Sequence, residues 1–452
     1  MNNPWLRLLP SRLSAQFAQR GYARRVANNS IWMLAERLLR YLIGFLIGIW
    51  IARYLGVEQY GLLSYASAFV SIFEWLSILG LDPAVVRELV DDPLRRDEAL
   101  GSLLALRFAG GVLMVVAIAL ALPAIDPADP RARVMIVMIS FAQLLVACDS
   151  LDCWFQATLT SRYAAFARIV VVMALAAVRV VLIWLQAPIE AFACAILVEA
   201  ALAAGGMVIV YRTAGGAPAR LQPSCAGMRS LLANGWPLVA AAAATSFYQR
   251  VDHVMIGELA GYGAVGAYSV AVRFVEVTYL APAVLLAAAF PALIIARTSD
   301  QSLFSNRVQA MFDVSVWVAV VLAGVLWMFG ASVISLLFGA SFAEAGKVLA
   351  VLAWMPLLAF TSMVRARVLM AENVLRAVLA IEVAICVLNV VGNVLLIPRW
   401  GAPGAACAAL ASAALAPLLI APFSVEVRRC NRALLLALVA PVRYWKGQGA
   451  RL

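Results

Sequence analysis

Long apolar runs follow one another along the whole chain and are separated by short polar connections. A helix needs about 20 mostly apolar residues to cross the hydrocarbon core of a bilayer. Reading for such runs predicts about twelve transmembrane helices, and the run at 434–441 is too short to add another. The predicted spans are residues 31–52, 61–81, 102–123, 133–154, 165–186, 189–211, 231–256, 264–295, 308–329, 345–370, 375–397 and 402–425. This pattern predicts an all-α polytopic membrane protein.

Composition agrees with the pattern. Hydrophobic residues make up 65% of the chain and charged residues 13%, with a mean hydropathy of +0.93. A soluble domain carries about 25% charged residues, so this chain has too few to cover a water-exposed surface. Its seven cysteines are scattered and include no C-x-x-C pair, which predicts small buried apolar residues. We expect neither a metal site nor a cofactor.

Charge sets the predicted topology. With the N-terminus in the cytoplasm and alternating spans, roughly two dozen arginines and lysines fall on the inner side and about five on the outer side. This bias predicts a multi-pass protein of the cytoplasmic (inner) membrane with both termini in the cytoplasm. The formal charge of +11 then reflects topology and contact with anionic lipids, and no nucleic-acid partner is expected.

The polar segment 212–229 predicts a linker between two lobes of six helices each, at 28–211 and 230–427. Basic cytoplasmic segments, 1–27 and 428–452, precede and follow the lobes. In the first of these, apolar residues recur every fourth position from Trp5 to Phe17, which favours a helix lying in the headgroup plane. A disordered basic tail is the alternative, because Pro10 interrupts that pattern.

Two hairpin sequences resemble each other, one in each half. The first, "LGVEQYGLLSYASAF", places Gly56 and Gly61 five residues apart, and "LAGYGAVGAYSVAVRF" does the same with Gly261 and Gly266. Glycines at these positions permit tight turns and close helix contacts. Duplicated halves with a substrate site between them are typical of secondary transporters.

Several ionisable residues remain inside the predicted spans. A charge at the centre of a membrane helix costs at least ~2.5–3.5 kcal/mol, so these residues must face protein or a wet cavity. Glu36 and Arg40 are spaced i,i+4, and Arg273 and Glu276 i,i+3, so each pair is able to neutralise itself on its own helix.

The stretch "FYQRVDHVMIG" differs from these pairs. Asp252 lies on the opposite helix face from Arg250, so Arg250 must find its partner on another helix, in water or on a substrate. Buried guanidinium groups suit phosphate and carboxylate oxygens, which they bind in a bidentate manner. His253 is the only histidine and is either a packed residue or a proton carrier.

The residues also resemble a known family. Resemblance runs in order from about Asn28 to Val427, and "FYQRVDHVMIG" and "VGAYSVAVRFVE" fill the patterns Y-x-R-x-D and R-x-x-E. The family is the lipid-linked oligosaccharide flippases of the Wzx or RfbX type, in the superfamily of the MATE drug exporters and lipid II flippases. Further matching segments are "NNSIWMLAERLLRYLIGFLIGIWIARYLGVEQYGLLSYASAF", "LGLDPAVVREL" and "NVVGNVLLIPRWGAPGAACA".

The resemblance implies a MATE-like, V-shaped pair of lobes that opens to each side in turn. It also implies a substrate, an oligosaccharide on undecaprenyl pyrophosphate, that is moved outward for O-antigen, capsule or exopolysaccharide assembly. A polysaccharide polymerase and a chain-length regulator are the implied partners. We predict substrate contacts from Arg250, Arg273, Arg40 and Arg37. The residues predicted for coupling to protons, to sodium or to neither are Asp252, Glu276, Glu382 and His253.

Two other classes compete with this hypothesis. A MATE-like antiporter of cationic drugs needs carboxylates facing an uncompensated lumen, whereas arginines accompany the acids in this chain. A membrane enzyme of polysaccharide assembly usually carries its reactive groups on a large outer loop. No long outer loop, nucleophile constellation or P-loop is present in the sequence, and we therefore predict no catalytic residues.

Overall fold

The structure, a computed structural model, describes residues 11–92, 94–125, 129–217, 221–282, 293, 297, 301–372 and 374–440. Side chains are described from residue 29 onward, except those of 124, 125 and 375. Every regular element in this part of the chain is helical. The elements are α1 (Ser11–Ile72), α2 (Trp75–Ile78), α3 (Asp82–Asp91), α4 (Arg96–Ile125), α5 (Pro130–Leu145), η2 (Val146–Leu151), α6 (Asp152–Ala157), α7 (Ser161–Trp184), α8 (Ile189–Thr213), α9 (Cys225–Ala260), α10 (Tyr262–Thr278), α12 (Gln301–Phe338), η4 (Ala340–Phe342), α13 (Ala343–Leu352), α14 (Met355–Ala371), α15 (Leu375–Trp400), α16 (Ala402–Ile420), η5 (Ala421–Phe423) and α17 (Val425–Leu438).

The all-α polytopic class is confirmed. Within the described residues, 9 helices are long and apolar enough to cross a membrane, or 10 if the pair that bends by 46° between Ala340 and Ala371 is one span. Helix α9 is not among them, because polar residues such as Arg250 and Asp252 interrupt its apolar sequence. The total of about twelve stays a prediction.

Two of the predicted spans, 31–52 and 61–81, share the single element α1. The element bends at Gly56, whose φ of 72° and ψ of 173° are not helical. Gly261, between α9 and α10, has nearly the same conformation, with φ 86° and ψ 168°. Only glycine adopts this region without strain. The two similar hairpin sequences therefore turn in the same way.

Other spans are less regular than their hydropathy suggests. The run 61–81 leaves the helix after Ile72, and Leu79 and Gly80 both have positive φ (58° and 64°) before α3 begins. The run 133–154 changes from α-helix to 3₁₀-helix at Val146. An acidic residue lies at each of these two breaks, Glu74 at the first and Asp149 at the second.

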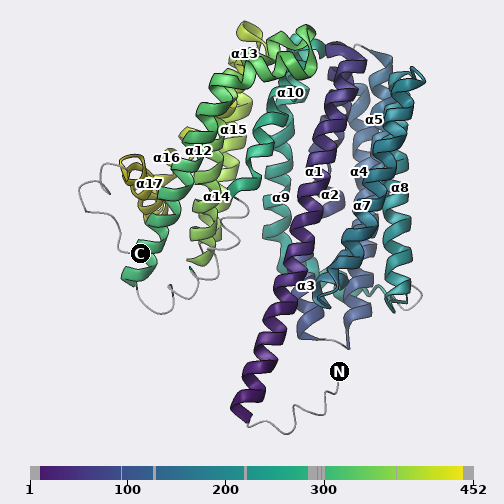
Figure 1. The fold of residues 1–452 in the computed structure, drawn as a ribbon, viewed down its shortest axis with the longest axis vertical. Coiled ribbons are helices and arrows are strands. Elements are labelled where there is room, and N and C mark those ends of the chain that lie inside the picture. The colour runs from purple at the N-terminus through teal and green to yellow at the C-terminus, as the bar shows by residue number, and fades with distance from the viewer. Residues whose placement is uncertain are drawn as a thin grey trace.

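The helices form two bundles (Figure 1). We call α1 to α8 the N-terminal bundle and α10 to α17 the C-terminal bundle. The bundles meet at the end where α10 and α13 lie beside the bend of α1, and their opposite ends spread apart (Figure 1). This is the V shape that the resemblance implied.

Helix α9 contacts both bundles. In its first half, Gly235 lies against Leu81, the residue before α3, and a Cβ atom on Gly235 would approach the Leu81 side chain to 2.1 Å. Near its end, Asp252 accepts a hydrogen bond from Asn393 of α15. The predicted division of the chain at 212–229 stays a prediction, as do the lobe limits 28–211 and 230–427.

The bundles meet through glycines of the two hairpins, a contact that we call the glycine seam. A Cβ atom on Gly61 would lie 1.8 Å from the carbonyl oxygen of Tyr262, and one on Gly266 would lie 2.1 Å from that of Val57. The contact is thus reciprocal, each hairpin placing a glycine on the backbone of the other. Only the absence of side chains allows the backbones to approach so closely.

Residues at the chain ends are described in part. Residues 11–27 form the first turns of α1, whereas 1–10 lie outside the described residues. The predicted tail 428–452 begins inside α17, and 441–452 lie outside the described residues. The predicted span 264–295 is followed as a helix to Pro282. The interfacial position of residues 1–27 stays a prediction.

Candidate functional site

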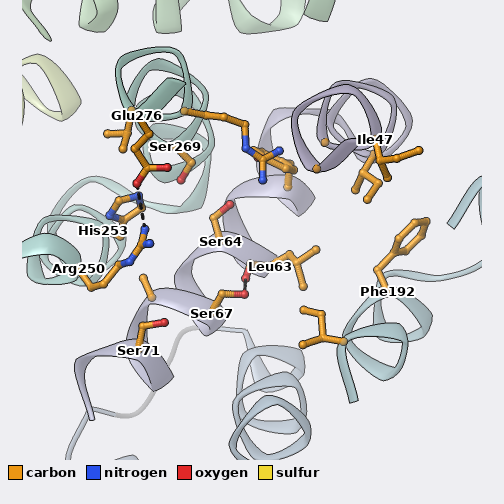
Figure 2. A pocket seen from close by; sticks show the side chains of 18 of the residues that line it. Ile47, Leu63, Ser64, Ser67, Ser71, Phe192, Arg250, His253, Ser269 and Glu276 are labelled. Carbon is orange, nitrogen blue, oxygen red and sulfur yellow. Dashed lines mark hydrogen bonds and ion pairs between the residues drawn. The ribbon is translucent and has the colours of Figure 1, made fainter. Parts of the chain in front are cut away.

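A cavity of about 350 Å³, which we call the central cavity, lies where the two bundles face each other. Figure 2 shows its two sides: Arg250, His253, Ser269 and Glu276 on one, with Ile47 and Phe192 on the other. Its lining comes from α1 on both sides of Gly56, α7, α8, α9 and α10. The lining residues are Gly44, Ile47, Gly48, Ile51, Tyr60, Leu63, Ser64, Ser67, Ala68, Ser71, Arg179, Phe192, Ile196, Arg250, His253, Ser269, Val272, Arg273 and Glu276.

The charged residues of the central cavity lie deep along their helices. At 1.5 Å per residue, Arg250 and Arg273 lie about 16–18 Å from the turn at Gly261. The hydrocarbon core of a bilayer is about 30 Å thick. Measured from that turn, both residues therefore lie along their helices at about half the thickness of such a core.

Arg250 finds its partner on another helix, as the sequence required. Its Nη1 atom lies 3.9 Å from Oε1 of Glu276 on α10 (Figure 2). Both side chains remain well exposed, at 36% and 41%. A pair this long and this exposed is weak, and both groups stay available to a ligand in the cavity.

The pairing of Arg273 with Glu276 that the spacing allows is not present among the described residues, where Glu276 lies nearest to Arg250. The Arg273 side chain extends instead across to α1, where Nη1 occupies the space that a Cβ atom on Gly48 would fill. This Nη1 is buried and has no hydrogen-bond partner among the described residues. Spacing of i,i+3 permits a pair on the helix but does not exclude a position against another helix.

Arg179 of α7 also lines the central cavity, and the sequence-based site did not include it. Its Nη2 donates to Oε2 of Glu199 on α8 at 2.5 Å. A signal was present in the sequence, because Arg179 has no acidic residue three or four positions away on its own helix. Such an arginine must find its ion-pair partner on another helix, as Arg250 does.

Serines line much of the remaining wall. Ser64, Ser67 and Ser71 recur at helical spacing on α1, facing the cavity, and Ser67 donates to the carbonyl of Leu63 (Figure 2). Ser269 stands on the opposite side, and its Oγ is buried without a hydrogen-bond partner among the described residues. The cavity therefore combines cationic groups with hydroxyl groups that are able to donate or accept.

Asp252 does not line the central cavity. It is 5% exposed and accepts hydrogen bonds from Tyr268 Oη and Asn393 Nδ2, both at 2.6 Å. The Oδ1 atom of Asn393 is buried beside it without a partner among the described residues. As the sequence predicted, Asp252 and Arg250 point to different sides of α9.

His253 lies between the central cavity and the buried surroundings of Asp252. The imidazole lines the central cavity and meets the Tyr268 ring edge-on, with centroids 5.1 Å apart. It is 4% exposed, and its Nδ1 has no hydrogen-bond partner in the described part of the chain. Packing accounts for most of its surface, and one nitrogen remains available.

Arg37 and Arg40 line a different cavity, of about 250 Å³, within the N-terminal bundle. We call it the inner cavity. Arg40 lies one helical turn before Gly44 of the central cavity, so one face of α1 lines both spaces. Arg40 Nε lies 3.2 Å from Glu36 Oε1, which confirms the predicted pair on the helix. The structure thus separates the four predicted arginines into two sites.

Charges of both signs balance in the inner cavity. Arg107 donates to Asp82 at 2.5 Å, and Arg168 lies 3.2 Å from Asp152. Arg107 is only 3% exposed and also donates to the carbonyl of Ile78. These pairs hold α3, α4, α6 and α7 together, and the inner cavity lacks the excess of arginine found in the central one.

Glu382 lines neither cavity. It lies on α15 within electrostatic range of Arg365 on α14, and its Oε2 is buried without a hydrogen-bond partner among the described residues. Arg365 is 5% exposed. Among the described residues, no cluster of three or more histidine, cysteine or acidic side chains is arranged to hold a metal ion.

Known structures share this fold. An inward-facing multidrug resistance MATE family transporter of the MOP superfamily matches with a TM-score of 0.68 at 12% identity, over 87% of this chain and 95% of its own. The lipid II flippase MurJ in an inward closed conformation also matches with a TM-score of 0.68, at 14% identity over 93% of each chain. An outward-facing MATE transporter gives 0.58 at 12% identity, over 90% of this chain and 96% of its own. Identities this low show a common fold and nothing further.

Sequence comparison identifies the family. No curated protein sequence matches the chain. The family model for "Polysaccharide biosynthesis protein" matches residues 26–297, which is more than half of the chain. The chain therefore belongs to the polysaccharide biosynthesis protein family.

Proposed function

We propose that this protein is a flippase for lipid-linked oligosaccharides. Its substrate is an oligosaccharide repeat unit on undecaprenyl pyrophosphate, which it moves outward across the bacterial cytoplasmic membrane. The product serves O-antigen, capsule or exopolysaccharide assembly, where a polymerase and a chain-length regulator would receive it. Alternating access of the two bundles performs the movement, and both chain termini face the cytoplasm.

The composition of the central cavity is the observation that carries this proposal. Three arginines and a single glutamate line it, and the Nη1 of Arg273 is buried without a partner among the described residues. A buried cationic group without a partner is costly, and a diphosphate would relieve that cost with charge-assisted hydrogen bonds. The serines supply further hydrogen bonds to sugar hydroxyls. The lipid tail is free to remain in the bilayer.

A cation antiporter fits this cavity poorly. Cationic cargo requires more carboxylates than cations in the lining, whereas three arginines and one glutamate line this cavity. Arg179 is paired with Glu199, and the remaining charge, on Arg273, would repel such cargo. The excess of guanidinium groups favours an anionic substrate.

Replacing Arg250 with alanine tests the proposal. A hydrogen bond to a charged group contributes about 1.5–3 kcal/mol, so we expect transport to fall about ten- to hundredfold. The measurement is the appearance of lipid-linked oligosaccharide on the far side of proteoliposomes. Arg162→Ala serves as the control, because Arg162 is exposed and bonds only to Tyr163 among the described residues. Normal transport by Arg250→Ala would exclude this role for the central cavity.

We further propose that Asp252 couples transport to an ion. The carboxylate is buried, and its two hydrogen-bond donors are neutral side chains. A buried carboxylate must be protonated or matched by a cation, and the unpartnered Asn393 Oδ1 offers one more oxygen to that cation. Occupancy of this group by a proton or by sodium would then differ between the two states of the bundles.

The coupling proposal predicts that Asp252→Asn removes the ion dependence of transport. Transport by the wild type in proteoliposomes should slow when one gradient, of protons or of sodium, is collapsed. Transport by the variant should proceed at the same rate with or without that gradient. The gradient that matters identifies the ion. Glu382→Gln is the matched control, since Glu382 is also an acid inside the C-terminal bundle. If the control loses the dependence and Asp252→Asn keeps it, Glu382 is the coupling residue instead.

A further inference from the structure

Helix α17 lies outside the candidate spans and is fixed to the C-terminal bundle along one face. Two side chains of α12 donate to its carbonyl oxygens at 3.0 Å: Gln309 to Ala433 and Trp317 to Ala437. The buried face of the helix consists of Val427, Cys430, Ala433 and Ala437. This attachment gives the opposite face a defined orientation.

The exposed face of α17 changes character along the helix. Arg428 and Arg432 occupy it in the first turns, and Leu435 and the C-cap residue Val439 continue the same stripe at the spacing i, i+4, i+7 and i+11. Leu435 is 65% exposed and Val439 49%. A basic end and an apolar end thus share one face.

The two arginines on this face are available to a ligand. Neither Arg428 nor Arg432 has an ion pair or a side-chain hydrogen bond among the described residues. Arg429 behaves differently, because its Nη1 lies 2.7 Å from Glu372, whose side chain is 5% exposed. Arg429 therefore fixes α17 to the end of α14, and Arg428 and Arg432 contribute charge to the surface.

We propose that this face binds an anionic phospholipid. Its phosphate would lie between Arg428 and Arg432, and its acyl chains would lie along Leu435 and Val439. The stripe from Arg428 to Val439 is about 16 Å long at 1.5 Å per residue, so its basic and apolar ends are far enough apart to contact the headgroup and the acyl chains of one lipid separately. The proposal does not depend on which substrate the protein transports.

Lipid-dependent stability of the full-length protein tests the site. Each basic residue near an anionic membrane surface changes affinity about fivefold, so Arg428→Gln/Arg432→Gln should bind phosphatidylglycerol about thirtyfold more weakly. We expect wild-type protein in nanodiscs of phosphatidylcholine to gain thermal stability when phosphatidylglycerol is added. The double variant should lose most of that gain, and native mass spectrometry should show fewer retained anionic lipids.

A control removes the same charge elsewhere. Arg87 and Arg162 are exposed arginines of the N-terminal bundle, and Arg87→Gln/Arg162→Gln should keep the response to phosphatidylglycerol. Arg428→Lys/Arg432→Lys keeps the charge and should respond like the wild type, which separates lipid binding from damage to the fold. An unchanged response in the double glutamine variant overturns the proposal. Equal stabilisation by soluble glycerol phosphate overturns it too, because that result would mean a phosphate site without a role for the acyl chains.

Discussion

Gly61→Ala and Gly266→Ala are each expected to separate the two bundles at the glycine seam and to lower transport about five- to hundredfold. An added Cβ would meet a backbone carbonyl oxygen at 1.8 Å or 2.1 Å, well inside the 3.4 Å at which ordinary contact begins. A backbone atom cannot move aside by a change of side-chain rotamer, so the helices themselves must move. Overpacking of this kind costs about 1–3 kcal/mol. A two-state equilibrium then shifts about five- to hundredfold toward the state in which the seam is open.

Spin-label distances measure this shift directly. Glu58 and Glu344 are exposed and lie on α1 and at the start of α13, on opposite bundles at the seam end of the molecule, so labels there report the opening (Figure 1). Gly263→Ala is the matched control, because a Cβ atom on Gly263 would meet nothing within 4 Å. The control should keep both the wild-type distance and the wild-type transport. If Gly61→Ala transports normally with an unchanged distance, close contact at the glycine seam does not set the balance between the two states.

The sequence predicted the class of fold because membrane helices are selected by one dominant property, the length of an apolar run. The predicted hairpin repeat also has a counterpart in the backbone, since Gly56 and Gly261 share one conformation. Contact between the two glycine hairpins was not predicted. Hydropathy describes each helix against lipid and carries no information on which helices touch.

The candidate site was predicted residue by residue with mixed success. The opposite orientations of Arg250 and Asp252 followed from helical geometry alone, because two residues on one helix that are two apart face different sides. Arg273 could not be placed in this way, since its position depends on Gly48, a residue more than two hundred positions earlier. Arg37 and Arg40 belong to the inner cavity for a similar reason. The cavity that this face of α1 lines depends on how the other helices of the N-terminal bundle pack against it, and not on the sequence of α1 alone.

Gly48→Ala is expected to reduce transport as much as Arg273→Ala does, about ten- to hundredfold if the guanidinium makes a charge-assisted bond to the substrate. A Cβ atom on Gly48 would lie 1.5 Å from Nη1 of Arg273. The arginine is flexible, so its end moves away and the fold is kept, in contrast to the seam variants. Transport is measured in proteoliposomes, and thermal unfolding should stay close to that of the wild type.

Gly44→Ala is the control for this prediction, because Gly44 lines the same cavity one turn earlier and a Cβ atom there would meet nothing within 4 Å. The double variant Gly48→Ala/Arg273→Ala decides between two mechanisms. If Gly48 acts only by giving space to the guanidinium, the double variant should be no worse than either single variant, since residues that act through one contact are not additive. Losses that add together would mean that Gly48 serves transport in another way, such as close helix approach during the movement of α1. A Gly48→Ala variant with normal transport would show that Arg273 does not need its place against α1, and the substrate contact would then have to rest on Arg250 and Arg179.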